Sequence, residues 1–208
     1  MRTLTSLAAL TALALSPFAL TGCDRQSESP AQTESHTEGL ADAQAEFFRN
    51  LATYCNQSFE GTIVEDTTGN PDFTSGPLIM HVMRCEEGRI LVPFHVGENH
   101  SRTWIFTTTD TGLRLKHDHR QEDGSDDDLT MYGGDTQSAG SATRQEFHAD
   151  AHTAELLPEA ATNVWTVELI PGERYSYALR REGTDRRFRV DFDLTRPVET
   201  PPMPWGWE

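Results

Sequence analysis

The sequence is poor in positive charge, and this restricts the partners and the chemistry open to the protein. Its 208 residues include 17 lysines and arginines against 33 aspartates and glutamates, for a formal net charge of −16. Such a surface repels nucleic acid and anionic lipid headgroups, so neither is expected as a direct partner. Lys116 is the only lysine, so an enzyme that forms a Schiff base would have to use this one side chain.

Several signatures of catalysis are also missing. The chain has no Gly-x-Ser-x-Gly nucleophile motif and no His-Glu-x-x-His metalloprotease motif. The stretch "YGGD" at residues 132–135 lacks the spacing and the lysine of a phosphate-binding loop. The acidic stretch "EDGSDDD" at residues 122–128 fails the EF-hand template, which needs alternating acids before its glycine and a glutamate after it. The sequence therefore names no reaction, and whether the protein is an enzyme stays open.

The longest apolar run, at residues 7–20, is too short to cross a bilayer as a helix, which takes about 20 apolar residues. Arg2 precedes this run, and Cys23 follows it directly in "LTGC". A charged start, a short apolar stretch and small residues before a cleavage point are typical of an export signal. The stretch resembles a bacterial lipobox, which implies a lipoprotein signal peptide at residues 1–22 and a lipid on Cys23. An ordinary signal, cleaved at a nearby small residue, is the alternative.

This interpretation implies a periplasmic protein held to a membrane by its lipid anchor. Asp24 directly follows the lipobox cysteine and resembles an inner-membrane retention signal of enteric bacteria, so the inner membrane is favoured over the outer membrane. Residues 23–39 are polar and lack large apolar side chains, which predicts a disordered tether.

The two remaining cysteines form an even pair in an oxidising compartment. We therefore predict a disulfide between Cys55 and Cys85 that stabilises the fold by about 3 kcal/mol, mainly by restricting the unfolded chain. Two buried free thiols are the alternative.

Beyond the tether, the hydrophobic pattern changes once. From Leu40 to Tyr54, apolar residues recur with helical spacing, which predicts one amphipathic N-terminal helix. From Phe59 onward they alternate with a period of two, and short turn-forming segments separate the runs. About nine strands are predicted, at residues 58–65, 78–85, 89–96, 101–110, 112–120, 142–150, 163–170, 174–181 and 186–194. A second, short helix is predicted at residues 151–157.

The short gaps between successive strands favour antiparallel hairpins, because parallel pairs need a crossover of a dozen residues or more. We predict a mostly β protein, in which residues 40–208 form a single domain built as an antiparallel meander. The meander is expected to close as a β-barrel, with a sandwich as the alternative. A proline-rich tail ends the chain, and its Trp205 and Trp207 could pack against the barrel.

One predicted hairpin brings polar and aromatic side chains onto the same sheet face. With its turn at residues 110–111, the opposed pairs are Trp104–His117 and Arg102–His119. Apolar residues share this face. The opposite face of the second strand carries Arg114, Lys116, Asp118 and Arg120, which belong in water. The face with the histidines is therefore expected to be the inner one.

The preceding hairpin adds a third histidine to this face. With a turn at residues 97–100, His95 would lie opposite Arg102. A buried arginine needs an anion or a carboxylate partner, because an unpaired buried charge is very costly. We therefore predict that the barrel binds a small, partly anionic ligand, without a cofactor, through His95, Arg102, Trp104, His117 and His119.

Two other interpretations remain open. Neutral imidazoles suit zinc or iron, so His95, His117 and His119 could hold a metal that assists hydrolysis, although the positive charge of Arg102 would oppose a cation. Alternatively, the same side chains form a purely structural polar network in an envelope lipoprotein that binds no ligand.

The stretches "LKHDHRQEDGSDDDLTMYGG" (115–134) and "PPMPWGW" (201–207) resemble a group of exported bacterial proteins, mostly of proteobacteria. The resemblance covers most of the chain after the tether; it implies export and supplies no mechanism. The predicted barrel resembles the lipocalin-like, or calycin, architecture in its strand order only. The disulfide-tied helix and a long loop at residues 129–142 depart from simple lipocalins.

Overall fold

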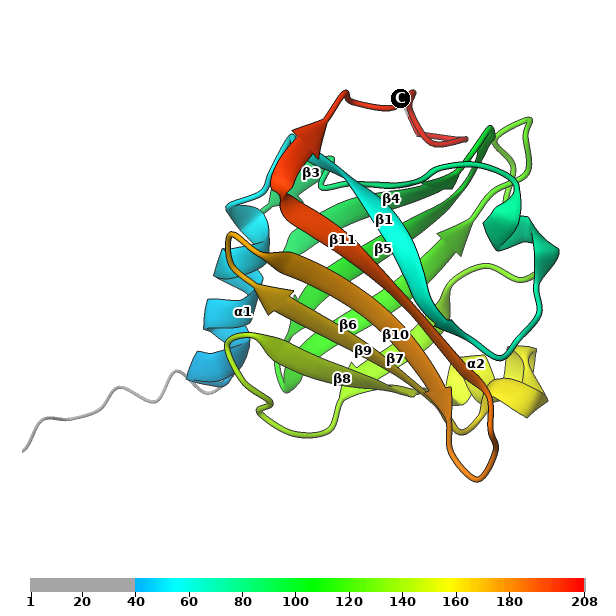
Figure 1. The fold of residues 1–208 in the computed structure, drawn as a ribbon. Coiled ribbons are helices and arrows are strands. Elements are labelled where there is room, and N and C mark those ends of the chain that lie inside the picture. The colour runs from blue at the N-terminus through cyan, green and yellow to red at the C-terminus, as the bar shows by residue number, and fades with distance from the viewer. Residues whose placement is uncertain (1–39, 208) are drawn as a thin grey trace, which may run out of the picture. The chain divides into compact units, whose positions relative to one another are not determined.

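The computed structural model describes residues 40–207, apart from the side chain of Asp72 (Figure 1). The predicted signal peptide, Cys23 and the tether all fall within residues 1–39, outside the described residues. The described part forms one antiparallel sheet of eleven strands in the order β2-β1-β11-β10-β9-β8-β7-β6-β5-β4-β3. Because β2 also pairs with β4, ten of these strands close into a barrel. The prediction of a mostly β protein, built as a closed antiparallel meander, is confirmed.

The elements of residues 40–207 are as follows. The helices are α1 (Asp42–Ala52) and α2 (Ala151–Leu156), and short 3-10 turns form η1 (Pro71–Thr74) and η2 (Pro158–Ala160). The strands are β1 (Ser58–Asp66), β2 (Leu78–His81), β3 (Arg84–Glu86), β4 (Arg89–Val96), β5 (Asn99–Thr109), β6 (Gly112–His119), β7 (Tyr132–Thr136), β8 (Arg144–Ala149), β9 (Asn163–Ile170), β10 (Arg174–Arg181) and β11 (Arg187–Val198). None of the described helices combines the length and the apolar character needed to cross a membrane.

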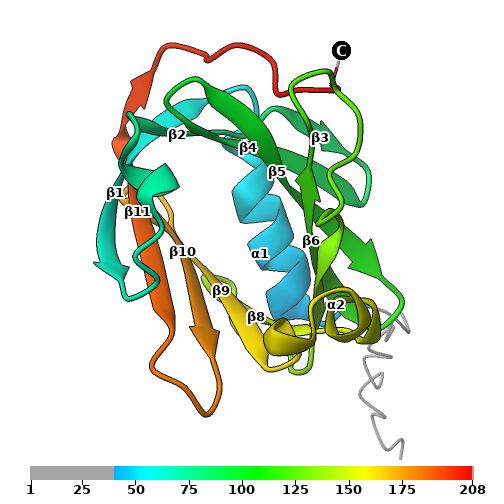
Figure 2. The same cartoon turned by 90° about the vertical axis from the view of Figure 1, so that its right-hand side faces the viewer.

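The predicted N-terminal helix is confirmed as α1, which lies across one end of the barrel, whereas α2 lies at the other end (Figures 1 and 2). Phe47 and Leu51 point from α1 into the core and are fully buried. Gln44 is also buried, and its side-chain amide donates to the hydroxyl of Thr136 on β7. The predicted Cys55–Cys85 disulfide is present and joins the segment after α1 to β3. The helix is therefore fastened to the barrel by apolar burial, a buried amide and a covalent bond.

The strand count differs from the sequence prediction at two places. The run at residues 78–85 is split into β2 and β3, which both pair along β4. The predicted loop at residues 129–142 contains β7, which the alternation of apolar residues could not indicate because it includes two glycines. A Cβ on Gly133 would lie 2.0 Å from the carbonyl oxygen of Leu115, and one on Gly134 would lie 1.6 Å from that of His148. The glycines thus allow β7 to lie against the backbones of β6 and β8.

The predicted register of the β5–β6 hairpin is confirmed, and two further hairpins place their apolar residues in the same way. The β5–β6 hairpin pairs Trp104 with His117 and Arg102 with His119. The β10–β11 hairpin pairs Leu179 with Phe188 and Tyr177 with Val190, and the β9–β10 hairpin has an odd, three-residue connection at residues 171–173. These registers direct the aromatic and aliphatic residues of the strands into the barrel.

The predicted pairing of β4 with β5 is wrong by one residue. Val96 pairs with Asn99 across the two residues 97 and 98, whereas the prediction used a four-residue turn at residues 97–100. Gly97 has a positive φ of 56°, which a tight hairpin turn of this kind requires. A β-bulge between Phe94 and Val96 then changes the register by one residue, so that Phe94, not His95, lies opposite Arg102 and His95 points to the outer face of the barrel.

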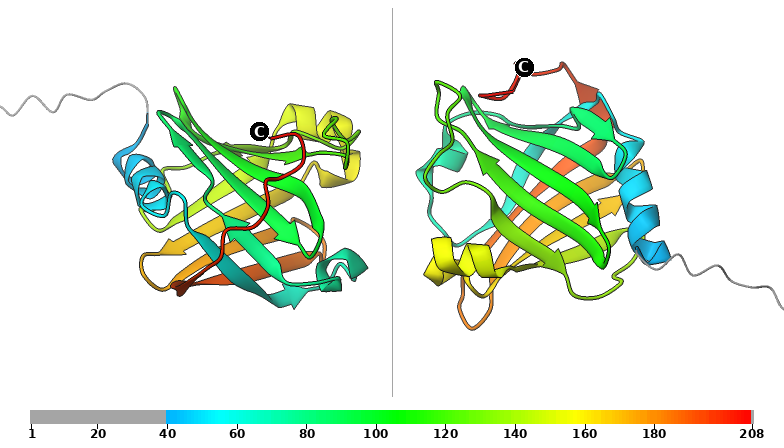
Figure 3. Two further views of the ribbon diagram at one scale, coloured as in Figure 1. Left: turned by 90° about the horizontal axis from the view of Figure 1, so that it is seen from above. Right: turned by 180° about the vertical axis from the view of Figure 1, so that it is seen from behind.

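The prediction that the C-terminal tail packs against the barrel is confirmed. Figure 3 shows the segment after β11 crossing the outside of the barrel over the strands near β4 and β5. The backbone amide of Trp205 donates to the carbonyl oxygen of His100 (3.0 Å), and the indole of Trp207 donates to Asp118 (2.9 Å). The tail is thus anchored to β5 and to β6.

Candidate functional site

A cavity of about 490 Å³ opens at the end of the barrel opposite α1. Its aromatic walls consist of Phe73, Phe94, Trp104, Tyr132, Trp165, Tyr177 and Phe188. Polar residues of its rim are Thr68, Asn70, Arg102, His119, Asp127, Glu159, Asn163, Arg181 and Arg186. The volume and the mixture of apolar walls with a few polar groups are typical of a site for a small organic molecule.

Stacked aromatic rings build the deep wall of the cavity. Trp104 lies between Phe94 and Tyr177, with ring centroids 4.9 and 4.3 Å away and planes inclined by only 14° and 17°. Trp104 is 3 % exposed. Alternation along β4, β5 and β10 directs these rings inward, and their mutual stacking leaves them little freedom to move. The wall is therefore largely formed before any ligand arrives.

His117 is fully engaged by its neighbours. Its Nδ1 lies 3.1 Å from the backbone carbonyl oxygen of Tyr132, which can only accept, so Nδ1 carries the proton. Nε2 then accepts from the hydroxyl of Tyr177, 2.6 Å away. Burial, helped by the nearby His119, lowers the pKa of His117 to about 3. His117 is thus a neutral side chain that orients Tyr177 in the cavity wall.

His119 lies nearer the mouth and is linked to Tyr132. The Tyr132 hydroxyl is 3.1 Å from Nε2 of His119. Burial and then the charge of Arg102 lower the pKa of His119 to about 4, against the opposing effect of Asp127 and Asp118. Burial raises the pKa of Tyr132 to about 12, so both partners are neutral at pH 7. They offer hydrogen bonds to a ligand without adding charge.

Arg102 supplies positive charge at the mouth. It pairs with His119 across β5 and β6, and its guanidinium carbon lies 5.7 Å from the ring centroid of Phe73 in η1. Its charge also lowers the pKa of Tyr132, as does the charge of Arg186 from the other side of the barrel. Arginines from separate walls therefore act on the same phenol.

Sequence reasoning missed Arg181 and Arg186, which flank the turn between β10 and β11 and line the cavity. Arg181 Nε donates to the side-chain oxygen of Asn163, 2.9 Å away. Burial and then the neighbouring charge of Arg186 lower the pKa of Arg181. Alternation could have found them, because Arg181 lies two residues after the inward-facing Leu179 and Arg186 two residues before the inward-facing Phe188. Trp165, Tyr132 and Tyr177 were likewise not assigned to the site.

Four of the five predicted ligand-binding residues line the cavity: Arg102, Trp104, His117 and His119. The fifth, His95, does not. It lies on the outer face of β4, where its ring contacts that of His100 edge-on at 4.6 Å between centroids. The exposed fraction of His95 is 2 %, and neither of its ring nitrogens has a hydrogen-bond partner among the described residues.

The metal alternative loses one of its three predicted ligands, His95, through the same displacement. His95 is separated from His117 and His119 by the sheet itself. Between residues 40 and 207, no group of three or more histidine, cysteine, aspartate or glutamate side chains has the geometry to hold a metal ion.

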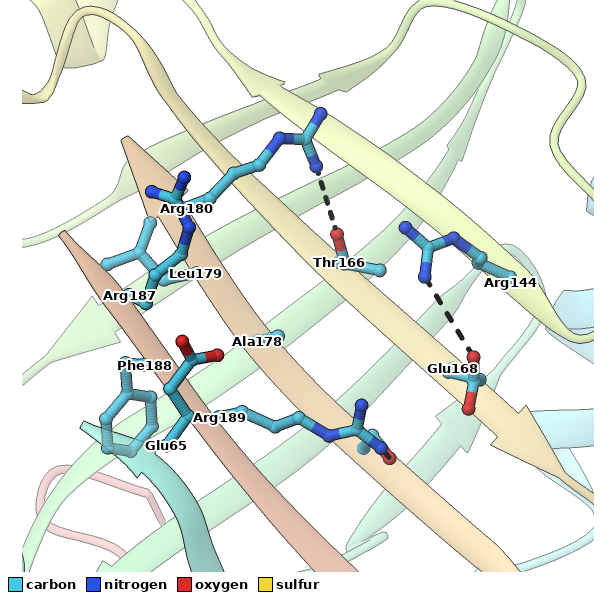
Figure 4. Close-up of a pocket in the computed structure, with 11 residues that line it drawn as sticks. Glu65, Arg144, Thr166, Glu168, Ala178, Leu179, Arg180, Arg187, Phe188 and Arg189 are labelled. Carbon is cyan, nitrogen blue, oxygen red and sulfur yellow. Dashed lines mark hydrogen bonds and ion pairs between the residues drawn. The ribbon is translucent and has the colours of Figure 1, made fainter. Parts of the chain in front are cut away.

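A second hollow, of about 190 Å³, lies on the outer face of β8 to β11 (Figure 4). Several of its charged side chains are already paired. Glu146 accepts two hydrogen bonds from Arg180, each 3.0 Å long, and Arg189 binds both carboxylate oxygens of Asp191. Arg144 also bonds Glu146 (2.6 Å) and lies 3.9 Å from Glu168. This hollow is part of a cross-strand ion-pair network and offers less to a ligand than the barrel cavity does.

No protein-family model, curated protein or solved structure matches the chain. A function therefore has to be inferred from the side chains of the cavity.

Proposed function

We propose that the protein binds a small amphipathic anion in its barrel, with the apolar part of the ligand between the aromatic walls and the anionic group at the mouth. The observation that carries this proposal is the gathering of Arg102, Arg181 and Arg186 on the rim of a cavity of about 490 Å³ with aromatic walls. In a chain with nearly twice as many acids as bases, this rim is unusual, because its three arginines outnumber its two carboxylates, Asp127 and Glu159.

Each part of the site has a role in this binding mode. The guanidinium groups attract and hydrogen-bond the anionic group, with geometry that suits carboxylate or sulfonate oxygens. The neutral pair His119 and Tyr132 adds hydrogen bonds, and the stacked wall around Trp104 shields the apolar part of the ligand from water. No step of this binding requires a metal or a cofactor.

The cellular setting of the proposal comes from the N-terminal sequence. A lipid on Cys23 would hold the barrel at the periplasmic face of a membrane, with the inner membrane favoured by Asp24. There the protein would act as a tethered, lipocalin-like binding protein, an analogy that rests on the closed antiparallel barrel alone.

Two fluorescent probes of similar shape test the proposal. 1-Anilinonaphthalene-8-sulfonate carries an anionic group, and N-phenyl-1-naphthylamine is its neutral counterpart. We expect Arg102→Gln to weaken binding of the sulfonate by about tenfold or more, because a charge-assisted hydrogen bond is lost, and to leave binding of the amine nearly unchanged. Arg114→Gln is the matched control, because Arg114 lies exposed on the outer face of β6 in an ion pair with Asp135.

The proposal fails if neither probe binds in the cavity, or if Arg102→Gln and Arg114→Gln have the same effect on the sulfonate. A thermal melt of each variant separates loss of binding from loss of fold. If Arg102 only stabilises the barrel, Arg102→Gln lowers the melting temperature and weakens both probes together.

A further inference from the structure

The two stretches that the sequence singles out, "HDHRQEDGSDDD" and "PWGW", pack against each other on the outside of the barrel. On β6, alternate residues point in opposite directions: His117 and His119 face the cavity, and Asp118 faces outward. Asp118 is nevertheless 1 % exposed, because the C-terminal strap (residues 200–207) covers it. A carboxylate buried on the outer face of a barrel needs strong hydrogen-bond donors.

The strap supplies one of these donors and is held by several contacts. The indole Nε1 of Trp207 donates to Asp118 (2.9 Å), and the guanidinium carbons of Arg89 and Arg120 lie 5.6 and 5.9 Å from the ring centroid. Gly206 lies against Gly124, where a Cβ on Gly206 would be 2.6 Å from the Gly124 carbonyl oxygen. Glycines in both chains thus let the strap touch the acidic loop directly.

The same carboxylate fixes the loop at the cavity mouth (residues 121–131). Arg120 Nε donates to both oxygens of Asp118 at 3.0 Å, and its Nη1 lies 2.7 Å from Asp126. The hydroxyl of Thr130 donates to Asp118 (3.3 Å) and accepts from the backbone amide of His119 (2.8 Å).

The loop in turn forms part of the cavity. Asp127 and Leu129 line it, and the backbone amide of Asp127 donates to the carbonyl oxygen of His119 (3.0 Å). Tyr132 follows directly after the loop. A continuous chain of contacts therefore runs from the strap, through Asp118, to the side chains at the mouth.

We infer that Trp207 and Asp118 are positioning residues for the ligand cavity: the C-terminal strap clamps the mouth loop from outside and so sets how readily a ligand enters and leaves. This inference rests on the proposed function for its consequence, but the clamp itself can be tested without a ligand. Release of Trp207 leaves Asp118 with fewer donors, loosens the loop, and opens the mouth without altering the aromatic wall.

The test is Trp207→Phe in the full chain, which keeps an aromatic ring near the two arginines and removes the indole N–H together with part of the ring. Trp205→Phe is the matched control, because Trp205 anchors the strap through its backbone amide, which phenylalanine retains. Thr130→Val is a second variant that breaks the chain of contacts inside the loop and keeps the side-chain shape.

Two readouts are needed. Hydrogen exchange at the amides of Asp127 and Met131, which bond the carbonyl oxygens of His119 and His117, reports the loop. Stopped-flow dissociation of 1-anilinonaphthalene-8-sulfonate reports the mouth. We expect Trp207→Phe and Thr130→Val to raise both rates by about tenfold, and Trp205→Phe to change neither, because a lost hydrogen bond to a charged group has an effect of this size.

The outcomes separate the clamp from the proposed function. Faster loop exchange with no probe binding in any variant would uphold the clamp and overturn the ligand site. Unchanged loop exchange and unchanged dissociation in Trp207→Phe, with the probe bound, would overturn the clamp and leave the proposed function intact.

Discussion

At the cavity, neutral histidines supply hydrogen bonds and arginines supply positive charge. Burial holds the pKa of His117 at about 3 and that of His119 at about 4, so at neutral pH both imidazoles act as hydrogen-bonding groups without charge. The positive charge of the mouth comes from arginines, which remain protonated at any physiological pH. An anion would therefore be bound with little dependence on the titration of the histidines around neutrality.

Two tyrosines on β10 offer a matched test of the hydrogen bonding in the barrel. The Tyr177 hydroxyl donates to His117, whereas that of Tyr175, also buried, has no hydrogen-bond partner among the described residues. We expect Tyr177→Phe to lower the free energy of unfolding by about 1–3 kcal/mol, because Nε2 of His117 is left buried without a donor. Tyr175→Phe should be nearly neutral or stabilising.

Urea unfolding of both variants, without ligand, measures the difference. Equal destabilisation by the two substitutions would show that the Tyr177–His117 hydrogen bond does not stabilise the fold.

At the scale of the elements, the sequence predicts strands well and hairpin registers only where the turn is evident. The β5–β6 register was predictable because Asp110 and Thr111 form the turn and apolar residues alternate cleanly on either side. The β4–β5 register was not, because residues 90–96 are buried on both faces and alternation cannot decide between them. The β-bulge between Phe94 and Val96 reverses the faces of the residues before it and has no evident signal in the sequence, so His95 was placed on the inner side.

β7 shows a second limit of prediction from the sequence, because the reason for its two glycines lies in the neighbouring strands. Gly133 and Gly134 carry no side chains that could show an apolar alternation. Glycine is needed at both positions because the backbones of β6 and β8 leave no room for a Cβ. The arginines at the end of the β10–β11 hairpin were within reach of the sequence, because alternation puts Arg181 on the face of Leu179 and Arg186 on the face of Phe188.

A glycine pair tests the close packing of β7. We expect Gly134→Ala to lower the free energy of unfolding by about 3 kcal/mol or more, because the new methyl group overlaps the His148 carbonyl and backbone must move. Gly172→Ala is the control: its φ is 72° but nothing lies within 4 Å, so only the left-handed backbone is penalised, by about 1–2 kcal/mol. Near-UV circular dichroism and urea midpoints measure both, and a Gly134→Ala variant as stable as the control would refute the close approach.

At the scale of the whole molecule, buried histidines link stability to pH: burial lowers the pKa of His81, and that of three others is lowered further. The pKa is lowered to about 4 in His95 and His119 and to about 3 in His117, in each case mainly by burial. In the unfolded chain these groups bind protons below about pH 6.5. Between pH 6.5 and about 4 the unfolded state therefore holds more protons than the folded state, and folding stability decreases as the pH falls.

Each histidine contributes at most about 1.4 kcal/mol per pH unit within this window. As the pH falls, protonation of the many carboxylates relieves their mutual repulsion and stabilises the fold. A variant is therefore needed to isolate the contribution of a histidine. We expect His95→Leu to lose less stability than the wild type between pH 7 and pH 5, because it removes a buried ring whose nitrogens have no partners among the described residues. His152→Gln, at an exposed position of α2, is the control; identical pH profiles of wild type and His95→Leu would contradict the assignment.

The central claim is that an amphipathic anion binds inside the barrel, and the four tryptophans provide a direct test of it. Trp104 and Trp165 line the cavity, whereas Trp205 and Trp207 lie in the strap on the outer face. Each gives one indole N–H signal in a ¹⁵N-correlated NMR spectrum, assigned by single Trp→Phe variants. On titration with 1-anilinonaphthalene-8-sulfonate, we expect the signals of Trp104 and Trp165 to shift and saturate together, with much smaller changes in the strap signals. Shifts confined to Trp205 and Trp207, or no saturable shift in any tryptophan, would contradict binding in the barrel.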